Sequence, residues 1–122
     1  MNPLWTDLAR RASVELSDDQ GAALSRFLDL LLEGNARMNL TRITDRDAAE
    51  VQHVGDALTL LPFLPAGAIR VVDVGSGGGV PGIPLAIARP DATILLIEST
   101  KKKALFLKQT IEALGLKNAS VS

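Results

Sequence analysis

The first half of the chain carries apolar side chains at the three- and four-residue spacing of helices. Ser17 and Gln20 have the spacing of a capping box, in which each residue satisfies a backbone N–H of the other. The stripe that follows predicts a helix with one face in the core, formed by Leu24, Phe27, Leu28 and Leu31. We expect this helix to stop at Gly34-Asn35, because both residues favour helix ends.

Two further helical regions flank this one. Asn2-Pro3 is a helix start, since proline suits the first helical position. Residues 44 to 47 begin a shorter helical region that is expected to run to Pro62. The sequence thus predicts a helical N-terminal region over residues 1–64.

From residue 65 onward the pattern changes to short β-branched runs that alternate with helical segments. Strands are predicted over 68–74 and 92–98 and at the final residues 119–122, with helices over 83–89 and 100–114. Such alternation predicts a βαβαβ unit in an α/β fold, with 68–74 as a buried parallel strand. We expect a single domain in which residues 65–122 form the first part of the sheet.

A sheet of this kind needs paired strands along its edges and helices on both faces. Three strands, the last one barely begun, provide little of either. We therefore expect the chain to be the N-terminal portion of a longer protein.

The amino-acid composition excludes several kinds of catalytic and metal site. The chain has 122 residues, a net charge of −1, one histidine and no cysteine, so thiolate metal sites and cysteine nucleophiles are excluded, and we expect no metal site. No apolar run reaches the roughly 18 residues of a membrane span, and the N-terminus lacks a signal peptide's apolar core, which favours a cytoplasmic location. Basic residues are scattered apart from Arg10-Arg11 and Lys101 to Lys103, so strong free-standing binding to nucleic acid is not expected.

Residues 73–87, DVGSGGGVPGIPLAI, hold five of the chain's ten glycines. A glycine-rich turn between a parallel strand and a helix presents free backbone N–H groups to a ligand. A P-loop is excluded because the loop has no lysine. The dinucleotide fingerprint GxGxxG, typical of NAD sites, is met literally by Gly77, Gly79 and Gly82, but its first glycine then falls two residues late relative to the strand.

The same loop also supports a different cofactor. Asp73 at the strand end, followed by alternating glycines at Gly75, Gly77 and Gly79, is typical of methyltransferases that use S-adenosylmethionine. Glu98 ends the next strand, where a carboxylate can accept both ribose hydroxyls of either cofactor. The residues of the loop alone leave both cofactors open.

Three segments together resemble the RsmG (GidB) family of bacterial methyltransferases, which modify guanine N7 in 16S small-subunit ribosomal RNA. They are residues 73–107, DVGSGGGVPGIPLAIARPDATILLIESTKKKALFL, residues 35–41, NARMNLT, and residues 53–58, HVGDAL. Their order and spacing match, and the segment from Pro81 to Pro84 is the most specific part. Two departures are Gly34, where the family usually has tryptophan, and Ala57, where it has serine.

The resemblance implies a Rossmann-like class I methyltransferase fold with an N-terminal helical extension, S-adenosyl-L-methionine as cofactor, and 16S ribosomal RNA or the small-subunit precursor as partner. It implies a monomer that does not bind membranes. It places the donor against Gly75, Ser76, Gly77, Gly79 and Val80, with Glu98 holding the ribose and Asp73 ordering the loop.

Guanine N7 is an in-plane lone pair without a proton, so its methylation needs positioning and desolvation rather than a general base. The candidates for a catalytic role are His53, paired with Asp56 on one helical face, and Asn39. Each also has a purely structural interpretation, His53 as a hydrogen-bonded residue between helices and Asn39 as a helix cap. The alternative functions are a fragment of an NAD-type enzyme and a non-enzymatic RNA binder in ribosome assembly.

Overall fold

The computed structural model describes all residues, 1–122, as helices packed against one parallel sheet. The sheet has the order β1-β2-β3, with β1 at Arg70–Val74, β2 at Thr93–Ile97 and β3 at Ala119–Val121. Val72 pairs with Leu95, and Leu95 pairs with Ser120, in parallel register. The predicted βαβαβ unit of a Rossmann-like α/β fold is confirmed.

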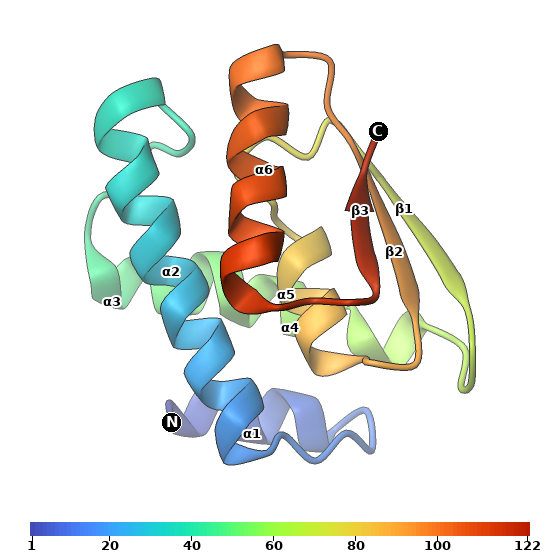
Figure 1. The fold of residues 1–122 in the computed structure, drawn as a ribbon. Helices are drawn as coiled ribbons and strands as arrows, with labels where there is room; N and C mark the ends of the chain where they lie inside the picture. The colour runs from blue at the N-terminus through green and yellow to red at the C-terminus, as the bar shows by residue number, and fades with distance from the viewer.

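Two crossover helices connect the strands. Helix α5, Gly82–Ala88, joins β1 to β2, and helix α6, Lys101–Leu114, joins β2 to β3. Both lie on the same side of the sheet, with α6 between β3 and the long helix α2 (Figure 1). The glycine-rich loop therefore sits at the carboxyl end of β1, where α5 begins.

Only one face of the sheet is covered by helices, which corrects the prediction that β1 is a fully buried strand. Ile94 and Leu96 on the covered face are completely buried, whereas Val72 and Val74 on the opposite face are 54% and 75% exposed. Side chains of a strand alternate between its two faces, so a sheet covered on one side buries every second residue.

The N-terminal region is helical, as predicted. Its elements, in chain order, are α1 at Pro3–Arg10, α2 at Asp18–Met38, α3 at Arg46–Ala49, the π-helical η1 at Glu50–Gly55, α4 at Asp56–Leu58 and the 3-10 helix η2 at Leu61–Phe63. The capping box of Ser17 and Gln20 is confirmed by both of its hydrogen bonds. None of these helices combines the length and apolarity needed to cross a bilayer.

Helix α2 does not stop at Gly34-Asn35, so that prediction is wrong. It continues to Met38 and ends at Asn39, whose φ of 52° is left-handed. Gly34 is buried, and a Cβ there would lie 2.6 Å from Cε1 of Phe106 in α6. The glycine therefore permits close packing of two helices, and the Phe106 ring lies where a larger side chain at position 34 would be.

The region from residue 44 to Pro62 is helical but not one regular helix. Asp45 caps α3 through the N–H of Ala48, and the backbone then widens into η1. At the first residue of η1, the Trp5 indole Nε1–H donates to the Glu50 carbonyl oxygen at 2.9 Å. A side chain that bonds a helical carbonyl in this way is a recognised cause of an irregular turn.

One hydrophobic core joins the helical region to the sheet. The predicted stripe of α2 is confirmed, since its four residues are 0–1% exposed. The same core includes side chains of α5, β2 and α6, namely Ile83, Ile94, Leu96 and Leu107. The N-terminal helices thus pack directly beside the elements that hold the glycine loop.

Candidate functional site

The loop after β1 is held by backbone hydrogen bonds to the end of β2. The N–H groups of Gly75 and Ser76 both donate to the Ile97 carbonyl oxygen, at 2.8 and 3.2 Å. The buried Ser76 hydroxyl donates to the Asp73 carbonyl oxygen at 2.8 Å. Gly77 and Gly79 have φ of 54° and 97°, a left-handed backbone that other residues rarely adopt. The loop is therefore a fixed turn that keeps backbone close to any ligand.

Asp73 connects the start of the loop to its end. Its Oδ2 accepts the backbone N–H of Gly82, the first residue of α5, at 3.1 Å. Partial burial raises the pKa of the Asp73 carboxyl, and the bond from Gly82 opposes this shift. A Cβ on Gly82 would lie 2.8 Å from Asp73 Oδ2, so only glycine allows this approach.

Glu98, just after β2, reaches the same loop. Its Oε1 accepts the N–H of Gly77 at 2.8 Å, and its Oε2 accepts the N–H of Thr100 at 2.9 Å. The N–H bonds from Thr100 and Gly77 lower the pKa of this carboxyl. The side chain expected near the ribose is therefore a charged acceptor directly beside the glycines.

A cavity of about 370 Å³ opens over the loop. One wall is formed by Gly75, Ser76, Gly77, Gly78 and Val80, and the other by Leu31, Leu40, Thr41 and His53. Four of the residues predicted to bind S-adenosylmethionine therefore line the same cavity as residues of the helical region. The other three, Asp73, Gly79 and Glu98, are not on its wall. A Cβ on Gly79 would lie 2.7 Å from Cδ1 of Ile83, so this glycine allows close packing against α5.

Of the three candidate catalytic residues, only His53 lies at the cavity. His53 lines the cavity and is hydrogen-bonded through Nε2 to the Thr41 hydroxyl at 2.7 Å. Partial burial lowers the pKa of His53, and the charge of Asp56 opposes the shift. Asp56 is exposed and outside the cavity wall, and it makes no hydrogen bond with His53. Asn39 is an exposed residue that ends α2.

The sequence pattern did not identify Thr41 or Leu40 as site residues. Both lie in an irregular stretch after α2, where periodicity carries no information about which residues will face a cavity. The segment NARMNLT contains both of them, and this was the only sequence signal.

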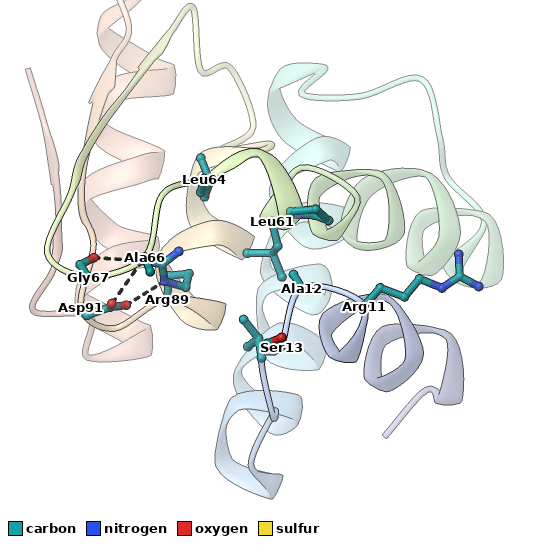
Figure 2. A pocket seen from close by; sticks show the side chains of 11 residues that line it. Arg11, Ala12, Ser13, Leu61, Leu64, Ala66, Gly67, Arg89 and Asp91 are labelled. Carbon is teal, nitrogen blue, oxygen red and sulfur yellow. Dashed lines mark hydrogen bonds and ion pairs between the residues drawn. The ribbon is translucent and has the colours of Figure 1, made fainter.

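A second hollow, of about 400 Å³, lies where the turn after α1 meets the loop before β1. Figure 2 shows Arg89 in it beside Gly67 and Asp91, with Arg11 extending away. Arg89 Nη2 donates to the carbonyl oxygens of Pro65 and Gly67 at 3.0 and 2.9 Å, and Arg89 is ion-paired with Asp91. Because Nε and Nη2 of Arg89 are bonded to the loop before β1 and to Asp91, this arginine anchors that loop.

Comparison with known proteins gives consistent matches. The family model for rRNA small subunit methyltransferase G matches residues 20–121. A Chromobacterium violaceum protein named ribosomal RNA small subunit methyltransferase G is 47% identical over 109 residues, covering 89% of this chain and 52% of the relative. Proteins of the same name from Sorangium cellulosum and Trichormus variabilis are 54% and 42% identical, covering 82% and 84% of this chain and 43% and 44% of the relatives. The chain spans about half the length of the curated relatives it matches.

Proposed function

This chain belongs to the rRNA small subunit methyltransferase G family, and we propose that it binds S-adenosyl-L-methionine and transfers its methyl group to N7 of a guanine in 16S ribosomal RNA. The observation that carries the proposal is the cavity over the glycine loop. Its volume of about 370 Å³ lies within the usual range of small-ligand sites. Its lining combines open backbone with apolar side chains, as a nucleoside requires.

The residues present fit the donor. Gly75, Ser76, Gly77 and Val80 would hold it against the loop, where the missing side chains of the glycines allow close approach. Glu98 is a charged acceptor at the edge of the loop, suited to the two ribose hydroxyls. Asp73 acts through Gly82, because its bond to that N–H sets the path of the loop into α5.

The donor, when bound, supplies a methyl group on a positively charged sulfur. The chain's own contribution is to align the two reactants and to exclude water. Leu31, Leu40 and Val80 provide apolar walls, and His53 and Thr41 provide the polar groups opposite the loop. No side chain has to remove a proton, because guanine N7 carries none.

We take the RNA partner to be 16S ribosomal RNA or the precursor of the small subunit. We propose that the protein acts in the cytoplasm and as a monomer. The chain's net charge of −1 gives little general attraction to phosphate. Recognition of the RNA would therefore depend on its shape and on the base that enters the cavity.

The test is transfer of a labelled methyl group from S-adenosylmethionine to small subunits that lack the modification. We expect label in 16S RNA as N7-methylguanine. Gly77→Ala and Gly115→Ala form a matched pair, since both glycines have left-handed φ, 54° and 65°, and no close neighbours, but only Gly77 lines the cavity. Gly77→Ala should reduce transfer about tenfold or more, and Gly115→Ala should retain it.

Two results would contradict the proposal. Equal transfer by Gly77→Ala and Gly115→Ala would separate the reaction from this cavity. RNA binding without transfer, unaffected by the donor, would instead identify an RNA binder.

A further inference from the structure

His53 is fixed through one of its two ring nitrogens. The Nε2 atom lies 2.7 Å from the Thr41 hydroxyl oxygen, which itself accepts the N–H of Ile43 at 3.1 Å. The N–H of Thr41 in turn donates to the side-chain oxygen of Asn35, in the last turn of α2, at 2.8 Å. The imidazole is thus tied to a loop that is itself tied to α2.

The hydrogen bonds of the Thr41 hydroxyl indicate which nitrogen of the neutral His53 ring carries the hydrogen. The Thr41 oxygen uses one lone pair for Ile43 and has a single proton of its own. Within the chain, the only partner for that proton is Nε2 of His53. If Nε2 accepts it, the neutral ring carries its own hydrogen on Nδ1. The opposite tautomer would leave the Thr41 proton without a partner within the chain.

The Nδ1 atom has no partner within the chain. No hydrogen bond within the chain involves it, and it is not completely buried. His53 lines the cavity opposite the glycine loop. The ring is also favoured in its neutral form, because burial lowers the pKa of His53 from its usual value near 6.5. A neutral imidazole N–H does not repel the positive charge of S-adenosylmethionine.

We propose that Thr41 is a positioning residue that holds His53 with Nδ1–H available to the methyl-accepting base, and that this donor selects guanine over adenine. The inference rests on the proposed function. Guanine presents two adjacent acceptors, N7 and O6, whereas adenine presents the N7 acceptor beside an amino donor. An Nδ1–H group pairs with O6 of guanine, and it meets another donor on adenine.

The first measurement needs no ligand. His53 is the only histidine, so ¹⁵N NMR of the labelled 122-residue chain reports its tautomer without assignment ambiguity. We expect the Nδ1–H form in the parent chain and in Thr41→Ser, which keeps the hydroxyl. We expect loss of this preference in Thr41→Val, which keeps the shape. An Nε2–H ring in the parent chain, or an unchanged tautomer in Thr41→Val, would overturn the role of Thr41.

The second measurement adds guanosine or adenosine monophosphate to the chain saturated with S-adenosylhomocysteine. We expect the guanine nucleotide to shift the His53 signals and to bind about three- to tenfold more tightly than the adenine nucleotide, as one hydrogen bond allows. Thr41→Val should lose this preference, and Thr41→Ser should keep it. Equal responses to both nucleotides, or no response to either, would overturn the selectivity. Failure of S-adenosylhomocysteine to bind would instead contradict the proposed function, while the tautomer would still decide the positioning role.

Discussion

Gly82→Ala tests whether close packing at the end of the glycine loop holds the site together. The new Cβ would lie 2.8 Å from Asp73 Oδ2 and even closer to Leu96, which is fully buried. Ordinary contacts between carbon atoms are about 3.5–4.0 Å. Neither neighbour can yield easily, because Leu96 is in the core and Asp73 is bonded to the N–H of residue 82 itself.

The cost has two parts. Overpacking of a well-packed core typically costs about 1–3 kcal/mol. Displacement of Asp73 weakens its bond with residue 82, which adds about 1 kcal/mol. The sum is a loss of about 3 kcal/mol in the free energy of unfolding, a large share of the roughly 5–15 kcal/mol of a typical domain. With an m-value near 1.5 kcal/mol per M, the urea midpoint should fall by roughly 2 M.

Urea unfolding followed by circular dichroism measures this change, with Gly55→Ala as the matched control. Gly55 is also buried, but the nearest atoms to a Cβ there are 3.5 Å away and its φ of −55° is helical. Alanine at position 55 should therefore leave stability within about 0.5 kcal/mol or raise it slightly. A Gly82→Ala midpoint no lower than that of Gly55→Ala would refute the packing argument.

Three further changes follow from other contacts. Gly34→Ala should destabilise the fold by about 1 kcal/mol, since overpacking against Phe106 outweighs alanine's helix preference, and an unchanged urea midpoint would contradict this. Arg89→Met should cost about 2 kcal/mol by removing the bonds that hold the loop before β1, measured by the same method, and parent-like stability would show that the bonds contribute nothing. The pKa of Glu98 is lowered in the folded chain, so its carboxylate stabilises the fold above about pH 4.5 and this contribution disappears as pH falls through the lowered folded value. The stability difference between parent and Glu98→Gln should therefore shrink on acidification, whereas a constant difference from pH 7 to pH 3 would argue against it.

Local sequence signals predicted most of the fold. The strands lie within two residues of their predicted bounds, at Arg70–Val74 and Thr93–Ile97, because each is a short apolar run with a glycine or proline near its start. The capping box was equally reliable, since it depends on residues three apart. These features are determined within a few neighbouring residues.

Features that depend on distant contacts could not be predicted. A glycine at position 34 is typical of a helix end, whereas its role here is set by Phe106, which is far along the chain. The irregular η1 begins at Glu50, where the indole of Trp5 reaches the backbone. One wall of the cavity has the same origin, because Leu40 and Thr41 reach the glycine loop only where the stretch after α2 packs against it.

The central claim is that the cavity over the glycine loop recognises S-adenosylmethionine. Isothermal titration of the chain with S-adenosylhomocysteine and, separately, with NAD tests it most directly. We predict saturable heat with S-adenosylhomocysteine, lost in Gly77→Ala and kept in Gly115→Ala, and no heat with NAD. Binding of NAD without binding of S-adenosylhomocysteine would contradict the claim.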